Sequence, residues 1–136
     1  MYLSLDHKSS TPLYLQLKEQ LHLAVATGVL QPGDQLPTVR DLAVRLRVNP
    51  NTVARVYREL QAEGLFASRQ GSGTFVADDA VSVGHAEAQS ILRQRLADAA
   101  SLAHSLDLSA AELRRLTDDA WRTAKSGREE VTPDEQ

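Results

Sequence analysis

The segment from residue 36 to residue 76 constrains the fold of this chain more than any other. It reads LPTVRDLAVRLRVNPNTVARVYRELQAEGLFASRQGSGTFV and contains two short helical patterns, a tight turn between them, and two strand-like stretches around a glycine-containing tip. The sharpest local signal is the pair Asn49 and Pro50, because asparagine is a strong N-cap residue and proline is favoured at the first helical position. This order of elements predicts a winged helix-turn-helix, in which the second helix is shaped to enter the major groove of DNA.

The predicted helix that begins after Asn49 has two different faces. At about 100° per residue, its apolar residues fall on one stripe and most of its basic and polar residues on the other. The apolar stripe contains Val53, Val56, Tyr57 and Leu60. The opposite stripe contains Asn51, Arg55, Arg58 and Ala62.

The polar stripe allows two interpretations. Most charged stripes on helices are simply solvated. The functional alternative is a surface that faces the DNA groove, on which Asn51 and Thr52 at the helix N-terminus reach base edges and phosphates beside Arg55 and Arg58. The preceding short helix and the following hairpin favour the functional interpretation.

Two flanking segments carry further candidate contacts. Thr38 resembles an N-cap, with Asp41 three residues on, so Arg40 lies near the start of a short helix, where it makes either an intrahelical ion pair or a contact to phosphate or guanine. Strand-like residues 65–68 and 74–77 surround a tip that starts at Arg69 and contains Gly71, because glycine permits positive φ there. The tip is either an ordinary hairpin loop or a wing whose arginine reaches a phosphate or the minor groove.

The charge of the chain is unevenly distributed. The net charge is −3, which by itself does not favour DNA binding. Residues 1–76 carry eight Lys or Arg against six Asp or Glu, whereas residues 77–136 carry seven against twelve. The acidic excess therefore lies behind the predicted DNA-binding module, and binding requires that the basic residues gather on one face.

Composition and motifs exclude several classes of function. The chain is 42% hydrophobic, enough for one compact core, and it has no cysteine, which excludes disulfides and thiolate metal sites and suits a reducing cytosol. The four histidines lack metal-ligand spacing, and no P-loop, nucleophile elbow or dinucleotide-binding motif is present. Neither a signal peptide nor an apolar run long enough to span a membrane is found. We expect a cytoplasmic protein without enzymatic activity, cofactor, metal or membrane partner.

Behind a winged domain at residues 1–77, we predict a linker at 78–84, a helical dimerisation segment at 85–126 and a polar, disordered tail at 127–136. The first helical pattern starts at about Ala86, and the run from Ser109 to Glu112 matches a capping box for the second helix. The short connection at 105–108 predicts antiparallel neighbours, and two such helices bury their apolar stripes by pairing with a second chain. The predicted dimerisation residues are Leu92, Leu96, Ala99, Ala103, Leu106, Leu113, Leu116, Ala120 and Trp121.

The motifs LPTVRDLA, VNPNTVARVYRELQAEGL and SRQGSGTFV resemble the DNA-binding domain of GntR-family bacterial transcription regulators. SSTPLYLQLKEQL and GDQLPTVRDLA belong to the same pattern, so the resemblance covers about residues 10–77. The two helices that follow are too short for the large effector domains of many members and resemble the YtrA-like subfamily. The resemblance implies DNA contacts at Arg40, Asn51, Thr52, Arg55, Arg69, Gln70 and Gly71. Asn49 and Arg58 complete the predicted DNA-binding set.

One departure from the family pattern affects the expected operator. Several better-known members have arginine where this chain has Pro50 and Ala54, so their base contacts cannot be transferred and the operator sequence should differ. The leading hypothesis is a homodimeric repressor that binds double-stranded DNA at a palindromic operator, which the resemblance associates with a transporter operon; no small-molecule effector is identified. The alternative is a winged-helix adaptor for protein–protein interaction without DNA binding, which should present an apolar or acidic outer stripe.

Overall fold

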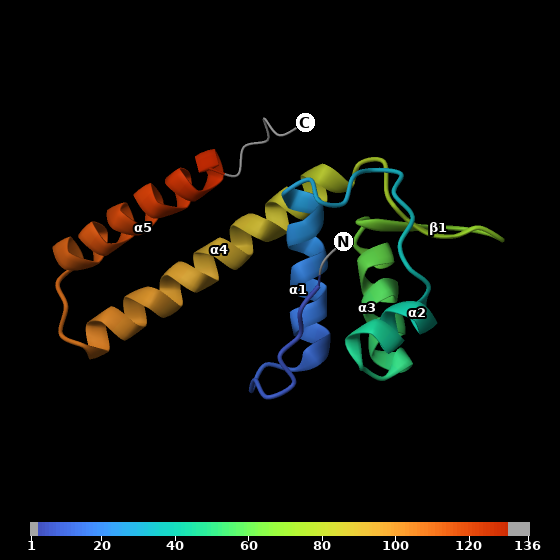
Figure 1. Ribbon diagram of the computed structural model, residues 1–136, viewed down its shortest axis with the longest axis horizontal. Coiled ribbons are helices and arrows are strands. Elements are labelled where there is room, and N and C mark those ends of the chain that lie inside the picture. Colours follow the sequence, from blue (N-terminus) through green and yellow to red (C-terminus); the bar gives the residue numbers. More distant parts are fainter. Residues whose placement is uncertain (1–2, 131–136) are drawn as a thin grey trace. The chain divides into compact units, whose positions relative to one another are not determined.

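The computed structural model describes residues 3–130 of the chain, and within them it is mainly helical with one small β-hairpin (Figure 1). This confirms the predicted fold class. The chain separates into two compact units, one ending at Leu92 and the other beginning at Arg93. The elements in order are α1 (Leu13–Ala26), α2 (Val39–Leu46), α3 (Pro50–Ala62), β1 (Phe66–Arg69), β2 (Gly73–Val76), α4 (Ala80–Ser105) and α5 (Ala110–Glu130).

Helices α2 and α3 begin at the caps that the sequence predicts. The hydroxyl of Thr38 accepts a hydrogen bond from the backbone N–H of Asp41 at 3.1 Å. The side-chain oxygen of Asn49 accepts one from the backbone N–H of Asn51 at 2.8 Å, and Pro50 occupies the first turn. Each cap satisfies an N–H group that a helix start otherwise leaves without a partner.

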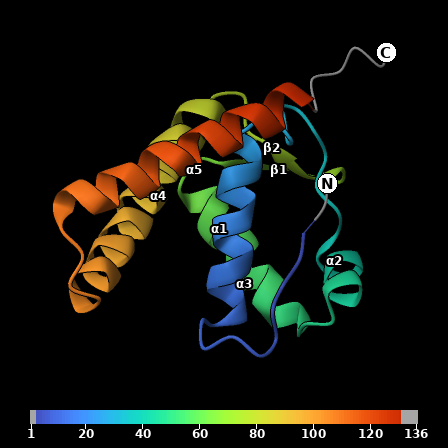
Figure 2. The same ribbon diagram turned by 60° about the vertical axis from the view of Figure 1, so that its left-hand side comes forward.

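The core of the first unit lies between α1, α2, α3 and the hairpin, and α1 and α3 lie side by side in Figures 1 and 2. Tyr57 anchors α3 there, because its hydroxyl donates a hydrogen bond to the carbonyl of Pro37 at 2.8 Å and its ring meets Phe66 edge-on at 5.5 Å. Burial also raises the pKa of the Tyr57 hydroxyl. The predicted apolar stripe is confirmed as the buried face of α3: Val53, Val56, Tyr57 and Leu60.

The hairpin is antiparallel, and both strands are shifted by one residue from the prediction. The first strand begins and ends one residue later than predicted, and the second begins and ends one residue earlier. Arg69 pairs with Gly73, so Arg69 ends a strand rather than beginning the loop. The extended segment before α2 joins the hairpin, because the backbone N–H of Leu36 donates to the carbonyl of Thr74 at 2.8 Å. Gln35 also forms a bridge with β2. The wing is therefore fixed to the chain that leads into α2.

Helix α4 begins earlier than predicted. The sequence placed its start near Ala86 and a linker at residues 78–84, but residues 80–84 are helical. Ala80 is fully buried in the core of the first unit, and a Cβ on Gly84 would lie 3.1 Å from the side chain of Val25 in α1. The first turns of α4 form because they pack on α1, and that tertiary contact leaves no periodic signal in so short a stretch.

Helix α5 also runs beyond its predicted end. The sequence predicts the end of the helical segment at residue 126, before Gly127, but the helix continues to Glu130. The remaining tail residues 131–136 lie outside the described part of the chain. At its other end the capping box is confirmed, since Ser109 N–H donates to Glu112 Oε2 at 3.0 Å and Glu112 N–H donates to Ser109 Oγ at 3.1 Å. Glycine costs only about 1 kcal/mol in a helix interior, so one glycine does not end a well-capped helix.

A short turn connects α4 to α5, which runs back along the part of α4 that belongs to the second unit (Figures 1 and 2), and most large apolar side chains of this hairpin stay exposed. Ala103 is buried at the turn and Leu113 is half-buried. Within one chain, most of the large apolar residues that the sequence assigns to pairing with a second chain are therefore uncovered. More than half of the surface is exposed for Leu92, Leu96, Leu102, Leu106, Leu116 and Trp121.

Ion pairs join α1 to α3 at the edge of the core. The amino group of Lys18 lies 2.7 Å from a carboxylate oxygen of Glu63 and 3.0 Å from one of Glu59, and the buried ring of His22 lies 3.0 Å from the other oxygen of Glu63. Partial burial by itself raises the pKa of Glu63, but the hydrogen bonds from Lys18 and His22 outweigh it, so this pKa lies below the ordinary value of 4.5.

This network predicts a pH-dependent contribution to stability. A lowered carboxyl pKa stabilises the fold above the unfolded-state value and loses that contribution as the pH falls through the folded-state value. We expect Glu63→Gln to lower the free energy of unfolding by about 1 kcal/mol at neutral pH and by progressively less below pH 4.5. Urea unfolding of both proteins across this range measures the difference. A difference that does not change with pH would contradict the prediction.

Candidate nucleic-acid interface

One side of α3, opposite its buried stripe, presents polar and basic side chains away from the core. Asn51, Arg55 and Arg58 are exposed, and Thr52 is half-buried, as expected for the side of a helix opposite its buried stripe. Asn49, which precedes them, is also exposed, although its side-chain oxygen is already used as the cap of α3. The helix is thus oriented so that its capped end and one polar face are open to a partner.

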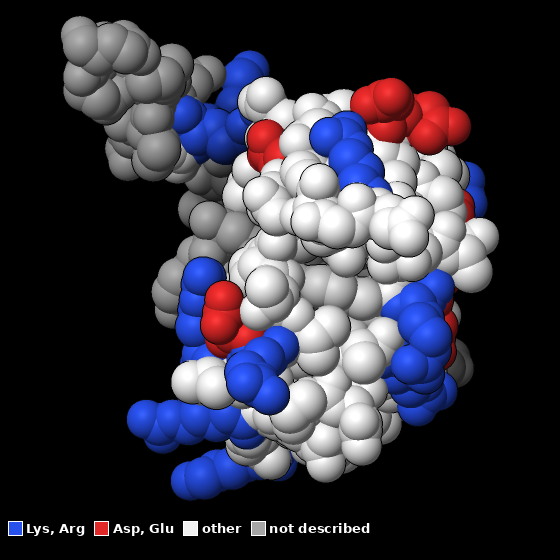
Figure 3. All heavy atoms as spheres, turned by 90° about the vertical axis from the view of Figure 1, so that its right-hand side faces the viewer, with Lys and Arg blue, Asp and Glu red and all other residues white. Residues whose placement is uncertain are grey.

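The helix-turn-helix carries a group of arginines that form no ion pair within the described residues. The group consists of Arg40 and Arg45 in α2, Arg47 at its end and Arg58 in α3, all exposed; we call it the free arginine group. Within the part of the chain that the structure describes, none of the four forms an ion pair, so the intrahelical pair considered for Arg40 is not seen. Figure 3 views the side of α2 and the wing and shows Lys and Arg side chains standing along it, with the larger acidic group at its edge. These cations are available to an anionic partner.

Sequence reasoning missed two members of the free arginine group. Arg45 and Arg47 were not among the predicted contacts, although both belong to the helix-turn-helix. Arg47 ends α2 in the left-handed conformation, with φ of 57°, which allows the chain to turn toward α3. Glycine or asparagine usually occupies such a position, so this arginine gave no turn signal. The close spacing of three arginines in residues 40–47 was the signal that could have indicated a basic surface.

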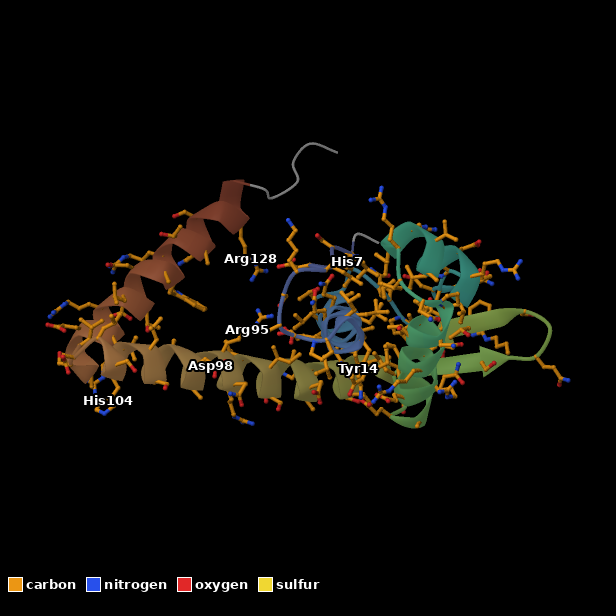
Figure 4. The ribbon with its side chains drawn as sticks, turned by 90° about the horizontal axis from the view of Figure 1, so that it is seen from below. His7, Tyr14, Arg95, Asp98, His104 and Arg128 are labelled. Atoms are coloured by element: carbon orange, nitrogen blue, oxygen red, sulfur yellow. The ribbon has the colours of Figure 1, made fainter. Side chains whose placement is uncertain are left out.

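Arg55 differs from the free arginine group because its side chain is held. Its guanidinium carbon lies 3.7 Å from the ring centroid of Tyr14 in α1, and its Nε donates a hydrogen bond to Glu59 at 3.0 Å. Tyr14 is labelled in Figure 4, where it lies between α1 and α3. The structure therefore places Arg55 at the edge of the α3 face that borders α1.

The wing tip carries the remaining predicted contacts. The guanidinium of Arg69 lies 4.2 Å from the ring centroid of Phe75, so this arginine is also held by an aromatic ring. Gln70 and Gly71 are exposed at the turn. Gly71 has φ of 77°, and no atom would lie within 4 Å of a Cβ added there, so the tip is open to solvent and its glycine is required by the backbone alone.

Two other kinds of site were sought in the described residues. Residues 3–130 contain no group of three or more His, Cys, Asp or Glu side chains arranged to hold a metal ion. In the same part of the chain, no helix combines the length and apolar character needed to cross a membrane.

Helices α2 and α3 with their turn, the preceding α1 and the hairpin define the winged helix-turn-helix class of transcription regulators. Residues 13–76 match the family described as "Bacterial regulatory proteins, gntR family". The chain belongs to this GntR family, as its motifs predict.

Individual relatives agree with this assignment. The HTH-type transcriptional repressor YtrA of Bacillus subtilis is 41% identical over 78 residues, which are 57% of this chain and 60% of that protein. YtrA from Sulfolobus acidocaldarius, a GntR-family transcription factor of known structure, is 34% identical with a TM-score of 0.54, over 71% of this chain and 99% of that one. The DNA-binding domain of AraR, solved in complex with operator ORX1, is 29% identical with a TM-score of 0.51, over 57% of this chain and 99% of that one. The chain thus spans 60% of the length of the Bacillus YtrA.

The open wing tip provides a test of its role. We expect Gly71→Val to weaken DNA binding more than it lowers the melting temperature, because a β-branched residue disfavours positive φ and displaces the tip without disturbing the core. Gly71→Asn is the matched control, since asparagine tolerates this conformation. Binding to duplex DNA and thermal unfolding are measured for both variants. If Gly71→Val unfolds readily but binds normally when folded, the tip has only a structural role.

Proposed function

We propose that this chain is a sequence-specific DNA-binding regulator that acts as a homodimeric repressor at a palindromic operator. The observation that carries the proposal is the free arginine group of the helix-turn-helix, whose four side chains are exposed. Lys18 is neutralised on the α1 side, whereas these four arginines keep their charge unpaired within the described residues. The operator-bound AraR domain, which has a similar fold, supports DNA as the partner.

The distribution of charge supports DNA over a protein partner. An adaptor surface is expected to be apolar or acidic along the outer stripe of α3, whereas this stripe carries Asn51, Arg55 and Arg58. Arginine recognises phosphates and guanine edges through paired donors, and short amides at a helix start reach base edges. Several members of the family have arginine at positions 50 and 54, where this chain has Pro50 and Ala54. We therefore assign base recognition by α3 to Asn51 and Arg58.

Salt-dependent binding tests the DNA-binding proposal. We expect the full chain to bind a short random-sequence duplex at low salt, with an affinity that falls steeply as salt rises because phosphate contacts release counterions. Arg58→Ala should weaken binding by about 1–3 kcal/mol if Arg58 contacts DNA. Arg115→Ala, which removes an exposed arginine of α5, is the matched control and should bind like the unchanged protein.

Fluorescence anisotropy of labelled DNA measures these affinities at several salt concentrations. The absence of salt-dependent binding by the unchanged chain would favour the adaptor alternative. Equal losses from Arg58→Ala and Arg115→Ala would contradict the assignment of the α3 face.

The exposed apolar residues of the second unit support the homodimer. Leu96 and Leu116 are 51% and 55% exposed, and Trp121 is 72% exposed. Exposed apolar rows along helices are typical of interfaces, and a second copy with the same rows can cover them across a two-fold axis. Such a dimer predicts two half-sites in inverted orientation, and the resemblance to YtrA-like regulators extends the proposal to a promoter of a transporter operon. An inverted repeat upstream of the gene tests this extension.

The single tryptophan gives a direct test of the dimer. We expect the emission of Trp121 to shift to shorter wavelength as the protein concentration rises, because dimerisation moves its ring from water to an apolar surface. Leu116→Glu should abolish this shift and produce a monomer in sedimentation. A chain that remains monomeric at micromolar concentration would contradict the homodimer.

A chain truncated before the second unit tests the contribution of the dimer to operator affinity separately from that of the DNA-binding face. The cut should follow Leu92 rather than the predicted linker, because Ala80 and Gly84 pack within the first unit. We expect this fragment to fold as a monomer with weaker operator affinity, since a dimer raises the effective concentration of the second domain at its half-site. Operator affinity equal to that of the full chain would contradict this role of the second unit.

A further inference from the structure

We propose that Tyr14 is a positioning residue for DNA recognition: its ring orients the guanidinium of Arg55 so that it can bind a phosphate of the DNA backbone. The inference rests on the proposed DNA-binding function and separates the residues of that surface that contact phosphates from those that contact bases. It assigns phosphate contacts to the arginines held by aromatic rings, and base contacts to Asn51 and Arg58. Phosphate contacts fix the position of a protein on the duplex, and base contacts select the sequence.

The geometry around Arg55 leaves the donors of its guanidinium edge available. The Tyr14 ring covers one face of the guanidinium at 3.7 Å, and Glu59 accepts a hydrogen bond from Nε. In the described part of the chain, the two terminal nitrogens have no hydrogen-bond partner. A planar fork fixed in this way matches the paired oxygens of a phosphate, and less side-chain freedom is lost when it binds.

The charges around Arg55 indicate that the orientation of its hydrogen-bond donors matters more for binding DNA than the long-range attraction of its positive charge. The hydrogen bond from Lys18, and then that from Arg55, keep the pKa of Glu59 below its ordinary value, so this carboxylate stays ionised. Lys18 also pairs with Glu63, so two cations and two carboxylates balance in this cluster. The cluster therefore offers directional donors rather than a net positive charge, in contrast to the free arginine group.

The position of Tyr14 is itself fixed by the core. The residue lies in the first turn of α1 and packs partly buried against the core cluster, in which Leu17 and Leu21 of the same helix are fully buried. Because α1 and α3 pack together, the ring of Tyr14 lies beside a side chain of α3. The packing of α1 thus sets the place at which the ring supports Arg55.

The wing repeats this arrangement. Arg69 lies over the ring of Phe75 at 4.2 Å, on the opposite strand of the hairpin. One aromatic-held arginine therefore belongs to the α1 edge of α3 and the other to the wing, whereas Arg58 has no such support. This contrast favours fixed phosphate contacts at Arg55 and Arg69.

Substitution of Tyr14 tests the proposal on a random-sequence duplex, because a phosphate contact does not depend on base sequence. We expect Tyr14→Leu, which keeps apolar bulk but removes the aromatic face, to weaken binding about two- to fivefold. Its salt dependence should remain unchanged, since Arg55 keeps its charge. Tyr14→Phe, which retains the ring, should bind like the unchanged protein, whereas Arg55→Ala should reduce the slope of log affinity against log salt by about one.

A double substitution distinguishes a positioning role from a general structural one. In the Arg55→Ala background, Tyr14→Leu should cause no further loss, because the pair acts through a single contact. Additive losses, normal binding by Tyr14→Leu, or equal losses from Tyr14→Phe and Tyr14→Leu would each overturn the proposal. Thermal unfolding identifies any variant that fails to fold. If Tyr14→Leu does not fold, Tyr14→Met, which also lacks the aromatic face, replaces it with the same expected loss. Failure of the unchanged chain to bind the duplex would instead overturn the proposed function.

Discussion

The burial of one side of α3 determines how every candidate contact is presented. Val53, Val56 and Leu60 are fully buried, and Tyr57 adds both packing and a hydrogen bond to the segment that leads into α2. Burying a side chain of this size stabilises a fold by roughly 1.5–3 kcal/mol, so rotation of α3 about its axis would lose several such contributions. The opposite side of the helix is therefore held in solvent, with its capped N-terminus exposed. The wing depends on the same core, because Phe66 packs against Tyr57.

Ion pairs and aromatic contacts divide the basic residues of the winged domain, apart from Lys8, into three kinds. Lys18 is neutralised at the α1–α3 edge, Arg55 and Arg69 are held against aromatic rings, and the free arginine group keeps its charge available. A protein with a net charge of −3 can still present a basic surface when its acids lie elsewhere. This arrangement accounts for how an acidic chain of this family retains an electrostatic basis for DNA binding.

The sequence predicted the parts of the fold that depend on local chemistry. The caps at Thr38, Asn49 and Ser109 and the buried stripe of α3 follow from hydrogen-bonding side chains and helical periodicity, and all are confirmed. The early start of α4 could not be predicted, because it depends on Ala80 packing against residues far away in sequence. The apolar rows of α4 and α5 predict burial against a second chain, and that pairing stays a prediction because a single chain leaves most of their large residues exposed. The candidate contacts at α3 and the wing tip are exposed as expected, but the aromatic support of Arg55 and Arg69 and the left-handed turn at Arg47 are three-dimensional features without a sequence signal.

In the proposed function, α3 and the wing tip form the DNA-binding surface. Backbone amide chemical shifts, recorded by NMR while the first unit is titrated with duplex DNA, test this assignment residue by residue. We expect the largest changes at residues 49–58, at Arg47 and at the wing tip around Gly71, with smaller changes on the α1 side around Lys18. Changes confined to α4, or spread evenly over the domain without a maximum at α3, would show that DNA binds elsewhere or without a preferred surface.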